Sequence, residues 1–214
     1  MKIQTSLCGD NLRRAALRSG ALLVSVLLFT DAFAGAQQQN MPQADHLEFA
    51  VMYSGAYANL ASDTNRFWLN GGTAELAGQS HHGYGAVCNV TGQHTASTGA
   101  GVPLNLLTTI FGPRYTWTPS RLSGQARTVS IFVEGLAGEA HGFRGLFPGP
   151  SSADSSSLSL AVKIGGGVEV SLSRHLSLRV VEASWLRTQL PNTTTDVQNN
   201  LQLDAGFVFH SAGR

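Results

Sequence analysis

The chain has 214 residues, of which 43% are hydrophobic, 8% aromatic and only 13% charged. It contains 14 basic and 13 acidic residues, and its formal net charge of +1 excludes the strong positive charge with which proteins bind nucleic acids. Two cysteines, Cys8 and Cys88, exclude a disulfide-rich scaffold.

The first 34 residues have the features of a secretory signal peptide. Four basic residues precede an apolar stretch over 21–29, and Ala32-Phe33-Ala34 fits the small-x-small pattern of a cleavage site. The apolar stretch is too short for a transmembrane helix. The signal holds four of the 14 basic and two of the 13 acidic residues, which leaves 10 and 11 in the mature chain. We expect a flexible lead-in over 35–46 to follow the signal.

Eight segments with strand-like, period-two alternation come next, separated by polar or glycine-rich breaks. In chain order they cover 47–59, 67–78, 84–93, 104–118, 128–143, 158–172, 176–190 and 199–210. The last segment has the clearest pattern, in which polar or small residues alternate with Leu201, Leu203, Ala205, Phe207 and Phe209. No long stretch shows a helical period, so the sequence predicts an all-β fold.

Three consecutive glycines, Gly165 to Gly167, raise the question of a phosphate-binding loop. Such a loop needs a helix directly after it. Here Val168, Val170 and Leu172 alternate with polar residues instead, and a short polar turn over 173–175 leads into another alternating segment. We therefore interpret this region as a β-hairpin, in which the inward-facing Gly165 and Gly167 make room for a large neighbour such as an arginine.

Ionisable residues of both signs lie in the middle of these segments. In a barrel embedded in a bilayer, such residues face inward and pair with one another while the apolar face meets lipid. We expect a polar network in the barrel interior, in which Arg114 or Arg179 lies beside the glycines and pairs with Glu169, Glu182 or Asp204, and Glu134 is also in mid-segment. Its predicted members are Glu75, Arg114, Lys163, Glu169, Arg179, Glu182 and Asp204.

The seventh segment needs a β-bulge for this prediction to hold. Arg179 and Glu182 have opposite parity in the alternation. Both side chains can face inward only if a bulge near Val180 and Val181 resets the pattern.

Aromatic residues gather towards the segment ends, as they do in the girdles that flank the apolar band of membrane barrels. They are Tyr53, Tyr57, Phe67, Trp68, Tyr115, Trp117, Trp185, Phe207 and Phe209. The connections also alternate in length. Longer ones over 60–66, 94–103, 144–157 and 191–198 alternate with connections over 79–83, 119–127 and 173–175, two of which are tight turns. Short inner turns and long outer loops are typical of bacterial outer-membrane barrels.

The mature chain resembles the small outer-membrane β-barrel proteins, the OmpA/OmpX-like eight-stranded barrels. The resemblance is carried by the segments Leu69–Thr73, Phe111–Trp117, Val133–Gly142, Gly165–Val168, Leu178–Trp185 and Leu203–Phe209. It implies an eight-stranded antiparallel transmembrane up-and-down β-barrel over 47–210, located in the bacterial outer membrane. It also implies contact with outer-membrane lipid and with the barrel assembly machinery. One departure is the tail over 211–214, because such barrels usually end on an aromatic residue and here His210 and the tail follow Phe209.

The patterns specify a fold and a location and not a chemistry, so we expect a structural or surface-interaction role without enzymatic activity and without a cofactor. The longest outer loop, over 144–157, is the candidate surface for an external ligand, through Arg144, Leu146 and Phe147. An alternative is a lipid-modifying barrel enzyme, for which His141 or His175 would have to act with a serine and a carboxylate. Another is a soluble, secreted, lipocalin-like barrel, which requires an apolar interior.

Two further features suggest no chemistry. His81 and His82 are adjacent, so on a strand they point to opposite faces, and no third ligand accompanies them. We therefore predict no metal site. Cys88 stands alone in the mature chain and fits an apolar strand position better than a nucleophile.

Overall fold

The structure, a computed structural model, describes residues 46–59, 66–80, 82–98, 101–119, 128–148, 153–192 and 196–211. All of them belong to one compact unit over Ala44–Arg214. The predicted signal peptide over 1–34, most of the lead-in and residues 212–214 of the tail lie outside the described residues. So do His81 and the greater part of the connections over 60–66 and 119–127.

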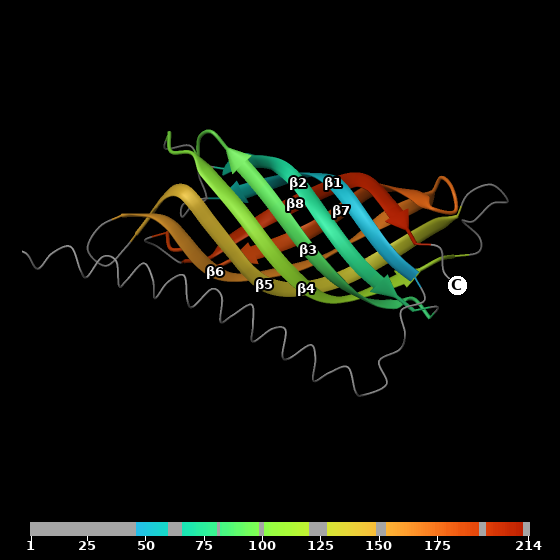
Figure 1. The fold of residues 1–214 in the computed structure, drawn as a ribbon. Helices are drawn as coiled ribbons and strands as arrows, with labels where there is room; N and C mark the ends of the chain where they lie inside the picture. The colour runs from blue at the N-terminus through green and yellow to red at the C-terminus, as the bar shows by residue number, and fades with distance from the viewer. Residues whose placement is uncertain are drawn as a thin grey trace, which may run out of the picture. The chain divides into compact units, whose positions relative to one another are not determined.

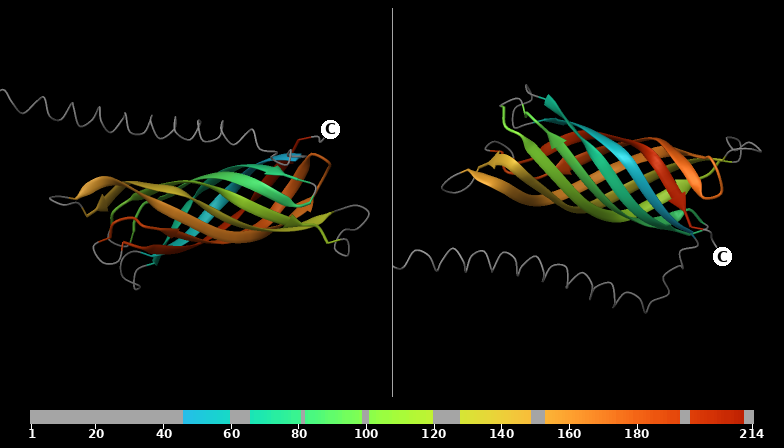
Figure 2. Two further views of the ribbon diagram at one scale, coloured as in Figure 1. Left: turned by 90° about the horizontal axis from the view of Figure 1, so that it is seen from below. Right: turned by 45° about the horizontal axis from the view of Figure 1, so that its top comes forward.

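The described chain forms a closed antiparallel barrel in which each strand pairs with its neighbours in sequence, and β1 also pairs with β8 (Figures 1 and 2). The strands are β1 (His46–Asn59), β2 (Arg66–Gln79), β3 (Tyr84–Thr95), β4 (Leu104–Trp117), β5 (Val129–Phe147), β6 (Asp154–Ser171), β7 (Leu176–Thr188) and β8 (Gln198–His210). The predicted eight-stranded, all-β, up-and-down barrel is therefore confirmed. Among the described residues no helix is long and apolar enough to cross a membrane.

The two ends of the barrel differ in their connections. The turn end holds the start of β1, the end of β8 and the turns over 80–83 and 172–175; the loop end holds the connections after β1, β3, β5 and β7. At the turn end, the Gly83 N–H donates to the Ser80 carbonyl over 2.9 Å, with a φ of 85° that favours glycine. The Leu172 N–H donates to the Leu176 carbonyl over 2.9 Å in the other turn.

The bulge predicted in β7 is confirmed. Val168 of β6 pairs with Val181, whereas Glu169 pairs with Arg179, so Val180 has no partner in this register. The pairing of β7 with β8 shifts between the same residues, Arg179 and Glu182. Because the bulge adds one residue, Arg179 and Glu182 both face the interior and both are fully buried.

The hairpin of β5 and β6 is longer than the sequence predicted. β5 runs to Phe147 and β6 begins at Asp154, so much of the predicted loop over 144–157 is strand. Arg144 has a φ of 59°, and the register shifts between Phe143 and Phe147, which marks a second bulge. Leu146 remains 67% exposed, as expected.

Two aromatic residues lie on the side of the wall opposite to the predicted one. Phe147, predicted to be an exposed loop residue, is buried because the bulge at Arg144 turns it inward. Phe67, predicted to belong to an outer girdle, is also buried, because it pairs with Ala58 on the inward parity of β1 and β2. Both belong to an apolar cluster inside the barrel.

Candidate functional site

The mid-strand ionisable residues come together inside the barrel. Because side chains alternate between the two faces of a strand, the inward parity of β2, β4, β5, β6, β7 and β8 carries all of them to the lumen. All eight are buried: Glu75, Arg114, Glu134, Lys163, Glu169, Arg179, Glu182 and Asp204. Burial of charged groups is unfavourable unless they are paired, so their partners decide what the site is.

Six of these residues form a closed ring of alternating charge, the charge ring. Arg114 contacts Glu75 over 2.7 Å and Glu134 over 2.5 Å. Lys163 contacts Glu134 over 3.3 Å and Glu182 over 2.5 Å. Arg179 completes the ring, with Glu182 at 2.7 Å and Glu75 at 2.9 Å. Each cation therefore touches two carboxylates and each carboxylate touches two cations, so the formal charges of the ring cancel.

Two acidic residues lie beside the ring. Glu169 contacts the Arg179 guanidinium over 2.7 Å from the side of the turn end. Asp204 accepts hydrogen bonds from the Thr73 hydroxyl over 3.2 Å and from the Gln202 amide over 2.9 Å. The sequence predicted that Arg114 or Arg179 would pair with Glu169, Glu182 or Asp204. Arg179 pairs with the first two, and Arg114 pairs with Glu75 and Glu134 instead.

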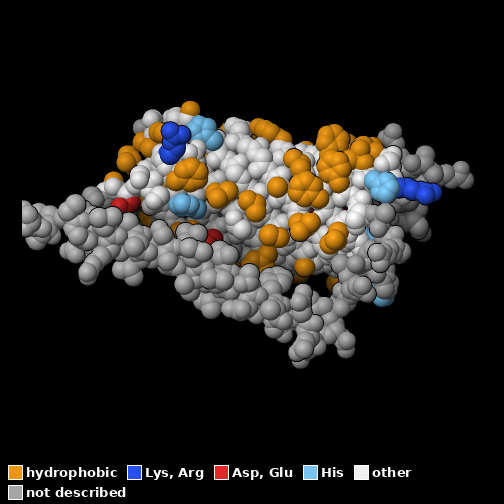
Figure 3. Space-filling model, viewed as in Figure 1, with side chains coloured by type: hydrophobic (Ala, Val, Ile, Leu, Met, Phe, Trp, Pro, Cys, Tyr) orange, Lys and Arg blue, Asp and Glu red, His pale blue; other side chains and the backbone are white. Residues whose placement is uncertain are grey.

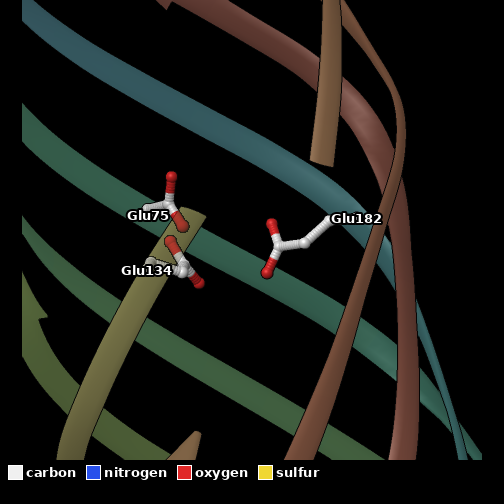
Figure 4. A group of neighbouring side chains, drawn as sticks. All are labelled: Glu75, Glu134 and Glu182. Carbon is white, nitrogen blue, oxygen red and sulfur yellow. The ribbon is translucent and has the colours of Figure 1, made fainter. Parts of the chain in front are cut away.

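The three glutamates of the ring are the candidate metal ligands of the described residues. Oxygen atoms of Glu75, Glu134 and Glu182 lie within 4.8 Å of one another, and Figure 4 shows their carboxylates converging in the lumen. Every one of them is already in contact with two cationic side chains. The guanidinium and ammonium groups of the ring supply the positive charge that a metal ion would otherwise bring. The geometry therefore fits an ion-pair network.

Phe132 fills the space beside Gly167, whereas a Cβ at Gly165 would meet Ser184. A Cβ at Gly167 would lie 2.8 Å from the Phe132 ring and 2.5 Å from the Val181 carbonyl oxygen. The large neighbour of Gly167 is thus a phenylalanine, and the prediction of an arginine at this place is wrong. Two arginines lie next to it: the guanidinium carbons of Arg114 and Arg179 are 4.4 and 4.5 Å from the centre of the Phe132 ring. These cation–π contacts favour the buried charges further.

Towards the loop end the interior becomes apolar. A cluster of buried hydrophobic side chains fills the lumen there, with Leu104 packed against it. Its larger members are Phe67, Leu69, Leu106, Ile110, Leu136, Phe147, Leu186 and Leu190. Eight strands enclose a space only just wide enough for side chains, so the charge ring and this apolar cluster together close the lumen.

A separate polar cluster occupies the turn end. The Ser177 hydroxyl lies 2.8 Å from His210 Nε2, and His210 Nδ1 lies 3.4 Å from Glu48 Oε1. The residues come from β7, β8 and β1. No local spacing in the sequence signals this contact, because Ser177 and His210 are 33 positions apart.

Among the residues that the structure describes, those considered for a lipid-modifying enzyme do not assemble into a site. His141 and Glu139 lie on the outer wall of β5, where the His141 ring contacts Phe143 at 5.6 Å between centroids. His175 is exposed in the turn between β6 and β7, whereas Ser177 is buried. Of the adjacent histidines, His82 is exposed in a turn and His81 lies outside the described residues. Cys88 is a free, exposed cysteine on the outer face of β3.

The outer wall carries the large apolar side chains. Figure 3 shows one face, on which hydrophobic side chains are spread along the wall of the barrel and Lys, Arg and His side chains lie towards the two ends. Near the turn end, the rings of Phe49 and Phe209 stack with 6.5 Å between their centroids, and the ring centroids of Tyr84 and Tyr115 are 4.9 Å apart. Other exposed members are Val51, Tyr53, Trp68, Leu76, Phe111, Trp117, Val133, Leu160, Ile164, Trp185, Leu201 and Phe207.

No protein-family model matches the chain, and no curated protein matches it either. Several solved structures are similar to it, among them the following three. Ail, the attachment invasion locus protein of Yersinia pestis, is 9% identical with a TM-score of 0.47, over 78% of this chain and 98% of Ail. Neisserial surface protein A is 13% identical with a TM-score of 0.48, over 75% of this chain and 96% of that protein. The N-terminal β-barrel domain of Pseudomonas aeruginosa OprF is 15% identical with a TM-score of 0.42, over 79% of this chain and 98% of that domain. At these values the similarities add no evidence about function, and the assignment of the fold rests on the closed strand order.

Proposed function

We propose that the chain is a bacterial outer-membrane β-barrel protein without enzymatic activity, which acts structurally or by binding partners at its external surface. One observation carries the proposal: large apolar side chains cover the outer wall, while eight charged side chains are buried in the lumen beside the apolar cluster. Exposed apolar surface costs about 25 cal/mol per Å² in water. In a bilayer the same wall is solvated by lipid, and only a closed barrel leaves no unpaired strand edge there.

The same distribution disfavours a soluble, lipocalin-like barrel. Such a barrel would need an apolar lumen for its ligand and a polar outer wall. Here the charge ring occupies the lumen, and residues such as Phe111, Trp117 and Ile164 are more than half exposed on the outside. A solute channel is disfavoured as well, because the ring and the apolar cluster fill the interior.

The proposed partners follow from this orientation. The turn end would face the periplasm and the loop end the exterior, since outer-membrane barrels have short periplasmic turns. The outer wall would contact outer-membrane lipid, and the barrel assembly machinery would recognise the end of β8 at Phe209. An external ligand would meet the projecting hairpin of β5 and β6, where Arg144 and Leu146 are exposed.

The hairpin of β5 and β6 is the best candidate for the external surface because it extends past its neighbours. β4 pairs with β5 only as far as Phe143, and β7 pairs with β6 only from Ala161 on. Leu146, which is 67% exposed, therefore lies on the described part of the hairpin that extends past the paired ends of β4 and β7.

Membrane fractionation with gel electrophoresis tests the proposal. The chain, expressed with its signal in a Gram-negative host, should appear in the outer-membrane fraction and migrate differently before and after boiling. A soluble product without this shift would overturn the proposal. In planar bilayers the purified barrel should give no steady conductance, whereas ion currents would refute the closed lumen. The enzyme alternative is tested by comparing lipid A from cells that express the wild type with lipid A from cells that express H141A or H175A. The same lipid A structure in all three would argue against that alternative.

A further inference from the structure

The side chain of His210 ties together three strands at the place where the barrel closes. Its Nε2 lies 2.8 Å from the Ser177 hydroxyl of β7, and its Nδ1 lies 3.4 Å from the Glu48 carboxylate of β1. Its backbone N–H donates to the His175 carbonyl over 3.0 Å. The side chains of His210 and Glu48 are 22% and 12% exposed, so protons from solution can reach them.

The seam is the line of backbone hydrogen bonds between β1 and β8 that closes the barrel. The hydrogen bonds next to His210 are the last of this seam at the turn end. Glu48 pairs with His210 in the register of the two strands. One residue further, the Ser211 N–H donates to the Leu47 carbonyl over 2.8 Å, and the Leu47 N–H donates to the Ser211 hydroxyl over 3.1 Å. Strand pairs at an element end are the first to open. The side-chain contacts of His210 therefore act where the seam is weakest.

The charged groups that face the imidazole come from three strands. Glu48 belongs to β1, Glu169 to β6 and Arg179 to β7. Glu169 and Arg179 are paired with each other over 2.7 Å, so their charges largely offset one another at the imidazole. The remaining titratable neighbour, His175, is exposed in the turn and meets His210 through its backbone. Glu48 is thus the charge that decides the state of His210.

The two protonation states of the imidazole bind the seam with different strength. An imidazolium has two N–H donors, so it can donate to Glu48 and to Ser177 at the same time. A neutral imidazole keeps one N–H and loses the charge that attracts the carboxylate. Its one N–H can still donate to the Glu48 carboxylate while its other nitrogen accepts from the Ser177 hydroxyl, so the two states differ by the ion pair with Glu48. Histidine ordinarily changes its charge near pH ~6.5, within the range that a periplasm-facing surface can meet.

We propose that the Glu48–His210–Ser177 cluster is a pH-operated latch, which holds the turn end of the β1–β8 seam more tightly when His210 is protonated than when it is neutral. Glu169, which contacts Arg179 of the charge ring, lies next to the latch. The latch depends on the closure of the barrel and not on the membrane location, so the two proposals can fail separately.

Hydrogen exchange of the purified barrel in detergent micelles tests the latch. After correction for the intrinsic effect of pH, the protection of the Leu47 and Ser211 amides should fall by about two- to fivefold between pH 5.5 and pH 8. The loop end of the same seam, where Tyr57 pairs with Leu201, is the internal control and should keep its protection. Equal protection of the Leu47 and Ser211 amides at both pH values would overturn the proposal.

Three variants separate the latch from a general response to pH. His210→Gln keeps a hydrogen-bonding side chain that does not change its charge. In this variant the protection of the Leu47 and Ser211 amides should be independent of pH and should equal that of the wild type with neutral His210. Glu48→Gln should lose most of the pH response for the same reason. His175→Gln, which removes a titrating group at the same end of the barrel, should keep the full response. A response that survives in His210→Gln, or disappears in His175→Gln, would refute the latch. A gel shift on boiling first establishes that each variant is folded.

Discussion

Replacing Arg179 by methionine should destabilise the barrel by about 3 kcal/mol. Arg179 is fully buried and contacts Glu75, Glu169 and Glu182 at 2.9, 2.7 and 2.7 Å. Removing one partner of a buried ion pair typically costs about 3–5 kcal/mol, because the other charge stays buried without compensation.

The contacts of the three carboxylates set the magnitude. Glu75 retains Arg114 and Glu182 retains Lys163 in the variant. Glu169 has no other ion pair among the described residues, so in the variant its buried carboxylate has no cationic partner. Its side chain is 9% exposed near the turn end, and partial hydration places the expected cost at the lower limit, about 3 kcal/mol.

Urea unfolding of the barrel, refolded in detergent micelles and followed by tryptophan fluorescence, measures this change. Arg187→Met is the matched control, because Arg187 lies exposed on the outer face of the same strand and should change the free energy of unfolding by less than ~0.5 kcal/mol. Adding Glu169→Gln to Arg179→Met should recover part of the loss. If Arg179→Met cost no more than Arg187→Met, the charge ring would not stabilise the barrel and the reasoning would be wrong.

Three other predictions concern the packing and the outer wall. Gly167→Ala should lower the free energy of unfolding by about 1–3 kcal/mol, since its Cβ would lie 2.5 Å from a carbonyl oxygen; Gly135→Ala, with nothing within 4 Å, should be close to neutral in the same urea titration. Phe147→Ala should cost about 3–5 kcal/mol because its ring is buried, whereas Leu146→Ala should cost almost nothing, and equal effects would contradict the inward turn of Phe147. Cys88 should resist a water-soluble maleimide while the barrel is in lipid vesicles and react after unfolding; fast labelling of the folded barrel would indicate that this wall faces water.

Much of the barrel can be predicted because period-two alternation is a local property of the sequence. It predicts the strands to within four residues at every end, and the mismatch between Arg179 and Glu182 predicts the bulge in β7. Alternation fails where a bulge has no such signature. At Arg144 no pair of ionisable residues of opposite parity indicates that a bulge changes which residues face inward. The length of β5 and the burial of Phe147 therefore do not follow from the sequence.

The contacts inside the lumen are harder to predict than the faces of the strands. The sequence indicates which ionisable residues point inward, but their pairing depends on register and on the curvature of the sheet. Phe132, whose ring takes the space beside Gly167, lies in a strand of ordinary composition and gives no local signal. The contact of His210 with Glu48 forms only because the first and last strands meet.

The charge ring also bears on how the barrel is completed. Most of its contacts join adjacent strands or residues within β7, so a flat sheet of β4 to β7 can form them. The two contacts of Glu75 are different, because they reach Arg114 of β4 past β3 and Arg179 of β7 past β1 and β8. Glu75 therefore keeps an uncompensated charge until the sheet has curled. In a lipid environment this penalises every half-open intermediate, so closure of the sheet and neutralisation of Glu75 become a single cooperative step.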